Sequence, residues 1–161
     1  MKKHLLYLFL FVFILISCEK DDFCTKETPK TPKLILRFYD NTNPDALKEV
    51  ELLSVIAQGI TDSLFAGEQT DSIAIPLNTE ALETVYILKT NTVDGNIINN
   101  KIETFTIKYT VEDIFISRAC GFKTVFNNLE ITSDNGWFIS FTPATLTSIN
   151  NQTNAHIKVY H

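Results

Sequence analysis

The stretch from Thr104 to Val111 sets bulky apolar side chains and polar ones in strict alternation. Phe105, Ile107 and Tyr109 occupy every second position, and threonine or lysine fills the positions between them. Successive side chains of a β-strand point to opposite faces of the sheet, so a period of two places one set in a core and the other in solvent. This stretch therefore predicts a half-buried strand.

Comparable runs recur along the chain, and no segment keeps a helical apolar spacing for longer than one turn. The composition agrees, because the 12 phenylalanines and the many isoleucine, valine and threonine residues fit a pleated, half-buried surface. We count eight or nine strands among the runs 34–39, 48–57, 62–65, 72–77, 84–92, 97–110, 114–119, 122–126, 129–133, 137–142 and 155–160. The predicted fold is all-β, an antiparallel two-sheet β-sandwich of immunoglobulin-like type.

The breaks between these runs predict how the strands are joined. Asp94-Gly95 and Asp134-Asn135-Gly136 are hairpin signals, since glycine accepts positive φ without penalty. Glu112 and Asp113 are expected to form a turn or bulge between two strands, with a more buried strand at 114–119. Residues 78–83 could supply one helical turn, and 155–160 suits a last edge strand.

The N-terminus predicts a secretory signal peptide over residues 1–17. Lys2 and Lys3 precede a run of twelve apolar residues, 5–16, which contains no charge, glycine or proline. At about 1.5 Å per residue such a helix covers about 18 Å, too little for a hydrocarbon core of about 30 Å. A cleaved leader is therefore preferred over a permanent membrane span.

Residues 15–18, Leu-Ile-Ser-Cys, resemble the lipobox of bacterial lipoproteins. This resemblance implies that Cys18 becomes the lipidated first residue of the mature chain, anchored through acyl chains; the alternative is an ordinary signal peptide that contains a cysteine. The next residues are similar to the acidic export tag of Bacteroidetes lipoproteins, which implies a place in the outer membrane, at the cell surface: Glu19, Lys20, Asp21 and Asp22. The alternative is a solvated charged tether.

The remaining two cysteines, Cys24 and Cys120, form an even pair in an exported protein. A disulfide between them would pin the start of the domain to a strand. The alternative is two free thiols, with Cys120 buried and Cys24 in the tether. Residues 18–33 contain two prolines and many polar residues, so they predict a lipidated, flexible tether ahead of a single domain at 34–161.

Three motifs carry a resemblance that spans nearly the whole mature chain. They are the opening strand 34–40 (Leu-Ile-Leu-Arg-Phe-Tyr-Asp), the turn 75–78 (Ile-Pro-Leu-Asn) and above all residues 116–122 (Ile-Ser-Arg-Ala-Cys-Gly-Phe). Together with the lipobox they are similar to a family of short Bacteroidetes lipoproteins with a domain of unknown function. The resemblance supports the fold class and implies no activity.

The composition argues against several functions. Removal of the leader leaves 12 basic and 19 acidic residues, a net charge of −7, which is unsuited to nucleic acid and to electrostatic attraction to anionic lipid. His156 and His161 lack the further ligands that a zinc site needs, so we expect no metal and no cofactor. Glu112 and Asp113 are adjacent, so they point to opposite faces of a strand and cannot flank one glycosidic bond.

Two surface features remain. Trp137 and Phe138 could contact a glycan from an exposed aromatic platform, although Trp137 more simply belongs to the core. Ser63 and Ser72 each follow an aspartate and precede an aliphatic residue, as in the O-glycosylation acceptor of exported Bacteroidetes proteins. The sequence thus favours a lipid-anchored, non-enzymatic envelope protein with a structural or protein-binding role; the alternatives are a glycan-binding module and, third, an envelope hydrolase.

Overall fold

The structure, a computed structural model, describes residues 24–25, 28, 30–93 and 95–161. The predicted leader, Cys18 and the acidic residues after it lie outside this part. Within it, strands dominate and the one helical element is a 3₁₀ turn, as the all-β prediction requires. The elements are β1 (Leu34–Tyr39), β2 (Val50–Ala57), β3 (Ser63–Thr70), β4 (Ser72–Ile75), β5 (Glu83–Thr90), η1 (Ile97–Asn99), β6 (Lys101–Ser117), β7 (Gly121–Ser133), β8 (Ser140–Thr142), β9 (Thr145–Ile149) and β10 (Ile157–Tyr160).

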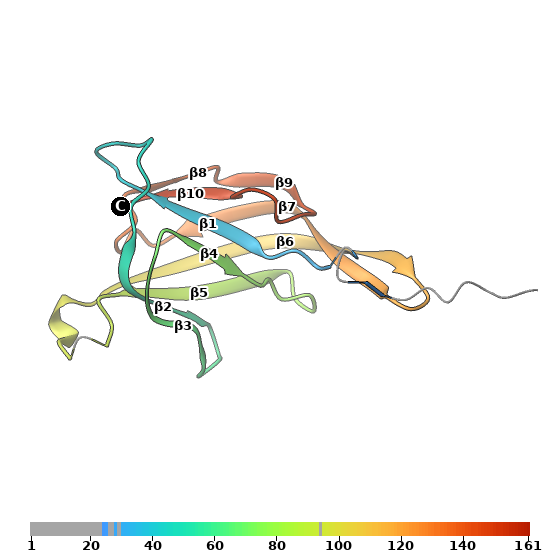
Figure 1. The fold of residues 1–161 in the computed structure, drawn as a ribbon, viewed down its shortest axis with the longest axis horizontal. Coiled ribbons are helices and arrows are strands. Elements are labelled where there is room, and N and C mark those ends of the chain that lie inside the picture. The colour runs from blue at the N-terminus through green and yellow to red at the C-terminus, as the bar shows by residue number, and fades with distance from the viewer. Residues whose placement is uncertain (1–23, 26–27, 29, 94) are drawn as a thin grey trace, which may run out of the picture.

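The strands form two sheets packed as a sandwich, which confirms the predicted architecture. The larger sheet has the order β3-β2-β5-β6-β7-β9 and the smaller has the order β4-β1-β10-β8 (Figure 1). β10 lies between β1 and β8 and pairs with β1 in parallel, with Phe38 opposite Val159. The prediction of a last edge strand was therefore wrong, because the buried side chains of β10 occupy the middle of the smaller sheet.

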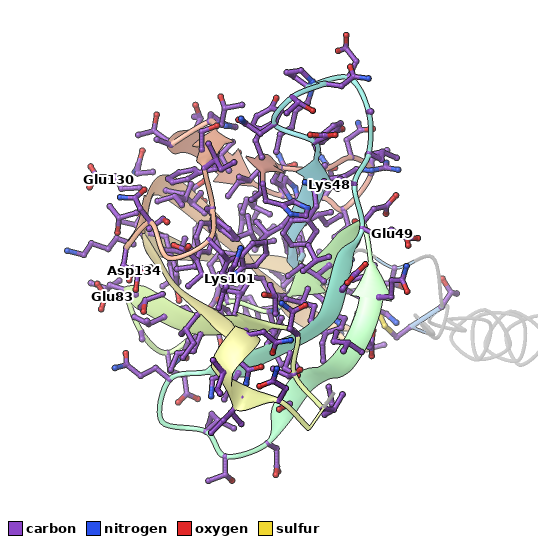
Figure 2. The ribbon with its side chains drawn as sticks, turned by 90° about the vertical axis from the view of Figure 1, so that its left-hand side faces the viewer. Lys48, Glu49, Glu83, Lys101, Glu130 and Asp134 are labelled. Carbon is purple, nitrogen blue, oxygen red and sulfur yellow. A yellow bond between two sulfur atoms is a disulfide. The ribbon has the colours of Figure 1, made fainter. Side chains whose placement is uncertain are left out.

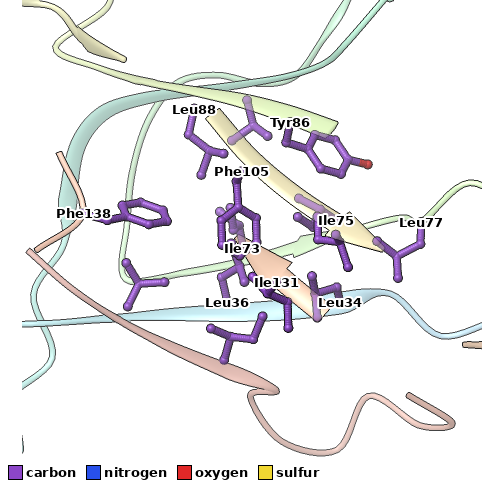
Figure 3. Close-up of a cluster of buried hydrophobic side chains, with 14 of the residues drawn as sticks. Leu34, Leu36, Ile73, Ile75, Leu77, Tyr86, Leu88, Phe105, Ile131 and Phe138 are labelled. Carbon is purple, nitrogen blue, oxygen red and sulfur yellow. The ribbon is translucent and has the colours of Figure 1, made fainter. Parts of the chain in front are cut away.

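The core fills the space between the inner faces of the two sheets. Leu34, Leu36 and Phe38 of β1 and Phe105 and Ile107 of β6 are fully buried, and Figure 3 shows several of these side chains converging from both layers. Each such side chain contributes about 1.5–3 kcal/mol when it leaves water. The apolar residues of the alternating pattern at the start of β6 are thus buried, as predicted.

One strand departs from simple alternation. Leu52 in β2 has a φ of 48°, and the register with β3 shifts between Val50 and Leu53. Beyond the bulge Leu53 and Val55 are fully buried, and with Val50 and Ser54 they are the buried residues of β2. The simple alternation expected over 48–57 is therefore interrupted at the bulge.

The predicted turn at Glu112 and Asp113 is absent, because β6 continues through both residues to Ser117. Each carboxylate bonds across to β7: Glu112 accepts from the Asn127 amide at 2.9 Å and Asp113 from the Thr124 hydroxyl at 2.7 Å. The chain turns only beyond Ser117 and re-enters the sheet as β7. The expected buried strand at 114–119 was also wrong, since residues 114 and 115 are exposed.

The loop at 134–136 does not make the predicted hairpin. It carries the chain from β7 in the larger sheet to β8 in the smaller one, where β8 pairs with β10. The predicted strand at 137–142 is reduced to Ser140–Thr142, and β9, which was not predicted, pairs with β7 instead. Residues 79–82 form a turn and a bend before β5, and the helical turn lies at η1.

Candidate functional site

The two ends of the sandwich differ, and the predicted site residues fall at both. At one end, where β5 meets η1 and the C-terminus lies, an open hollow has a volume of about 570 Å³. Figure 2 looks onto this end and labels Lys48, Glu49 and Lys101 around it. The hollow is lined by Lys48, Glu49, Val50, Glu51, Thr90, Asn91, Lys101, Asn135, Gly136, Trp137, Phe138, Ile139 and His161.

The wall of the hollow at residues 135–138 is positioned by the fully buried Glu103. Its carboxylate accepts hydrogen bonds from the backbone N–H of Trp137 at 2.8 Å, from that of Phe138 at 3.1 Å and from the Ser133 hydroxyl. Gly136 lies directly against β6, where a Cβ would meet the Ile102 carbonyl oxygen at 1.8 Å. Glycine is needed here for close approach rather than for a hairpin.

A second acid holds the same loop at its start. The backbone N–H of Thr104 donates to the Asp134 carboxylate at 2.9 Å, and the Asp134 N–H donates back to the Thr104 carbonyl at 3.2 Å. Burial alone would raise the pKa of Asp134, but the hydrogen bonds, those with Thr104 foremost, hold it below its ordinary value. Residues 133–138 are therefore fixed to β6 rather than free to adapt to a ligand.

Trp137 and Phe138 are core residues, as the simpler interpretation of the sequence predicted. They are 9% and 4% exposed, and both rings pack against Phe38 of β1, at 6.0 and 6.5 Å between centroids. The indole N–H donates to the Leu88 carbonyl at 3.3 Å. They do not form the exposed platform that the glycan-binding alternative required, and only a small part of the Trp137 side chain is accessible from the hollow.

The rim of the hollow joins the C-terminus to the segment before β2. The Lys48 ammonium donates to the His161 carbonyl oxygen at 2.9 Å, and the His161 Nε2 lies 3.2 Å from the Lys48 carbonyl. The imidazole packs edge-on against Trp137 at 5.5 Å. Burial lowers the pKa of His161, so the ring is mostly neutral near pH 7.

The two histidines of the domain form hydrogen bonds with different parts of the chain. The Nδ1 atom of His156 accepts from the Ile35 N–H at 2.9 Å, so its Nε2 carries the proton and donates to the Asn151 carbonyl at 3.0 Å. Burial lowers the pKa of His156 as well. Among the described residues, no three His, Cys, Asp or Glu side chains come together as a metal site.

The opposite end of the sandwich carries the disulfide. The structure contains the predicted bond between Cys24 and Cys120, with Cα atoms 5.1 Å apart. Cys120 stands in the turn between β6 and β7, which in Figure 1 is the tip of a long hairpin projecting past the other strands. The start of the described chain is thus fastened to that tip.

The segment between Cys24 and β1 contacts the domain at further points. The Thr31 hydroxyl accepts from the Thr124 N–H at 3.0 Å, beyond the point where β9 stops pairing with β7. Lys33 donates its backbone N–H to the Gln152 side chain at 2.7 Å, and Pro32 is buried. The described residues of the predicted tether therefore lie along the domain.

The hairpin tip also bears two exposed aromatic rings that sequence reasoning missed. Phe115 and Phe122 are directly opposite across β6 and β7, 56% and 66% exposed, with ring centroids 5.3 Å apart. A signal existed, because Phe115 continues the odd-numbered apolar series of β6 beyond Val111. The predicted turn at Glu112 concealed it.

The two candidate glycosylation sites differ in accessibility. Ser63 is exposed at the start of β3. Ser72 is half-buried in β4, where its hydroxyl donates to the Leu36 carbonyl at 3.2 Å. Of these two serines, only Ser63 is therefore accessible to a glycosylating enzyme.

These features define a class: a two-sheet β-sandwich in which a disulfide fastens the N-terminal segment to the tip of a long hairpin. The chain belongs to the family of unknown function DUF6452, whose model matches residues 52–161, from β2 to the C-terminus. No curated protein and no solved structure matches the chain. In the described part, no helix is long and apolar enough to cross a membrane.

Proposed function

We propose that this protein is a lipid-anchored outer-membrane lipoprotein, exposed at the cell surface, that serves a structural or protein-binding role without catalysis. The proposal begins from the order of features in the sequence: a leader, a lipobox cysteine at position 18, a short acidic run, and Cys24 only six residues after Cys18. An exported chain also suits a disulfide, which the reducing cytosol would not maintain.

The observation that carries the proposal is the bond between Cys24 and the hairpin tip. An acylated Cys18 would attach the sandwich to a bilayer by the hairpin end. β6 has 17 residues, which at about 3.3 Å per residue separates its two ends by about 50–55 Å. The opposite end, with the hollow, would then face away from the membrane and be accessible to a partner.

The test is fractionation of cells that express the full-length chain. Replacement of Cys18 by serine removes the sulfur that would carry the lipid, so the protein should incorporate no labelled fatty acid and should be lost from the outer-membrane fraction. The matched control is Cys24→Ser with Cys120→Ser, which removes the disulfide and should leave membrane attachment intact. Fatty-acid labelling of the Cys18→Ser protein, or its retention in the outer membrane, would refute the lipoprotein proposal.

Surface exposure is tested separately from anchorage. Replacement of Lys20, Asp21 and Asp22 by alanine should leave the protein in the outer membrane but protect it from protease added to intact cells. Equal digestion of the wild type and this variant would show that the acidic run is only a tether. Both proteins should be digested once the outer membrane is opened, which controls for folding.

A glycan-binding role is the second proposal, and the hollow is the feature that favours it. Asn91, Asn135 and Thr90 line it beside the edge of Trp137, a combination of polar groups and an aromatic edge that suits a sugar. Binding to a glycan array that is lost in Asn91→Ala and Asn135→Ala would support it. Absence of binding by the wild type, or binding unchanged by both variants, would refute it.

A further inference from the structure

The inner face of the larger sheet continues past the smaller sheet, and nothing in the described structure covers its far end. Odd-numbered residues of β6 point inward: Tyr109 is 4% exposed, Val111 is 38% exposed and Phe115 is 56% exposed. The register of β7 matches this face, with Phe126 opposite Val111 and Phe122 opposite Phe115. Phe126 is fully buried in the core. On the same face the hydrogen-bonded pair Asp113 and Thr124 separates this buried end from the exposed rings of Phe115 and Phe122.

The two exposed rings form a unit rather than two isolated side chains. Phe115 and Phe122 contact each other edge to face, with ring centroids 5.3 Å apart. A single exposed phenylalanine would need no explanation, but a paired aromatic tip on a projecting hairpin marks an interaction surface.

The charge around the tip differs from that of the whole chain. Residues 114–123 contain Arg118 and Lys123 and no acid, although the mature chain would have a net charge of −7. Basic residues that flank exposed aromatics are typical of segments that rest on anionic lipid headgroups.

The disulfide determines what this surface would meet. Cys24 is held at the tip, and the six residue steps between Cys18 and Cys24 span at most about 20 Å when fully extended. If Cys18 carries the anchor, the tip cannot move farther than this from the bilayer surface. We propose that Phe115 and Phe122 insert into the bilayer interface and orient the sandwich on the membrane; this inference rests on the lipid anchor proposed above.

A second apolar loop lies at the other end of the molecule and provides the natural comparison. Val93, Ile97 and Ile98 are 77%, 83% and 91% exposed in the loop between β5 and β6. Exposure alone would make that loop the better membrane contact. The disulfide favours the hairpin instead, because only the hairpin is fastened to the N-terminal segment.

The experiment uses the full-length protein purified from membranes and reconstituted in vesicles of phosphatidylethanolamine and phosphatidylglycerol, with or without phosphatidylcholine brominated on its acyl chains. The chain's one tryptophan, Trp137, is buried near the far end of β6 and serves as an internal reference. Phe122→Trp adds a reporter at the tip, and Ile98→Trp adds a matched reporter at the opposite apolar loop. Bromine quenches only those indoles that reach the acyl region.

We expect the brominated lipid to abolish most of the emission gained in Phe122→Trp, and to leave the emission of the wild type and of Ile98→Trp unchanged. Unquenched emission from Phe122→Trp, or quenching of Ile98→Trp instead, would overturn the inference and assign the tip to a protein partner. Flotation of the same vesicles separates the two proposals. Failure of the wild type to float would refute the anchor, whereas flotation without quenching would refute only the membrane contact of the tip.

Discussion

Replacement of Glu103 by alanine tests the account of how the loop at 133–138 crosses between the sheets. The side chain is fully buried, and its carboxylate accepts from the N–H groups of Trp137 and Phe138 and from the Ser133 hydroxyl. Alanine removes all three acceptor contacts at once. The two backbone N–H groups would stay buried without a partner unless the loop rearranged.

The magnitude follows from those groups. Each buried donor left without an acceptor costs about 1–3 kcal/mol, and the hydroxyl can turn toward another acceptor at smaller cost. Part of this loss of stability is offset, because the variant lacks the unfavourable free energy of burying a carboxylate. The net loss in the free energy of unfolding should be about 3–5 kcal/mol, which for a domain of this size lowers Tm by about 10–20 °C.

Two control variants should lose less stability than Glu103→Ala. Glu103→Gln keeps the volume and one carbonyl oxygen for the two N–H groups, and its amide can donate to Ser133, so it should cost only about 1 kcal/mol. Glu130→Ala removes an exposed acid of β7, labelled in Figure 2, and should change stability by less than about 0.5 kcal/mol.

Urea unfolding followed by Trp137 emission measures the three variants directly, since the indole lies beside the loop that Glu103 holds. The emission maximum of folded Glu103→Ala should also shift to the red as water reaches the indole. A stability loss in Glu103→Ala no larger than that in Glu103→Gln would refute the assigned role of the buried carboxylate.

Three further results are expected. Non-reducing peptide mapping should recover Cys24 joined to Cys120, and reduction should lower stability by at most about 4–5 kcal/mol; alkylation of both thiols without reductant would contradict the bond. Because burial lowers the pKa of His156, its contribution to stability is present above about pH 6.5 and is lost as the pH falls through the lowered pKa. An NMR titration midpoint at or above 6.5 would contradict this. Mass spectrometry should find glycan on Ser63 and not on Ser72, and modification of Ser72 would contradict the assignment made from burial.

The local pattern of the sequence was enough to predict the sandwich and most of its strands. β1 and the first half of β6 follow alternation that any core of two sheets would select, and their inward residues are those with no exposure. The disulfide could be predicted from the number of cysteines, because only Cys24 and Cys120 remain once Cys18 is assigned to the lipid. Where a bulge interrupts the pattern, as at Leu52, simple alternation does not show which side chains face inward, since one extra residue inverts the order beyond it.

The crossing at 134–136 could not be inferred from the turn residues alone. Asp-Asn-Gly is compatible with a hairpin and with a longer loop, and the choice depends on a partner about thirty residues earlier in the chain. The sequence did contain one indication, because Glu103 occupies an inward position directly before the apolar Phe105, Ile107 and Tyr109 of β6. A carboxylate at such a position needs donors, and the N–H groups of the crossing loop provide them.

The hairpin tip is uncovered because the strands of the two sheets differ in length, and the sequence of one strand alone does not show this difference. β6 has 17 residues and β1, in the facing sheet, has 6, so at about 3.3 Å per residue roughly 50–55 Å of one layer faces about 20 Å of the other. Alternation decides which side chains face inward, but only the second layer decides whether they are covered. Phe115 and Phe122 keep the inward orientation without the cover, and the disulfide holds the N-terminal segment at that end. An uncovered aromatic pair is unfavourable in water and favourable at a bilayer interface, so a lipid anchor on the same segment would turn the mismatch into a membrane contact.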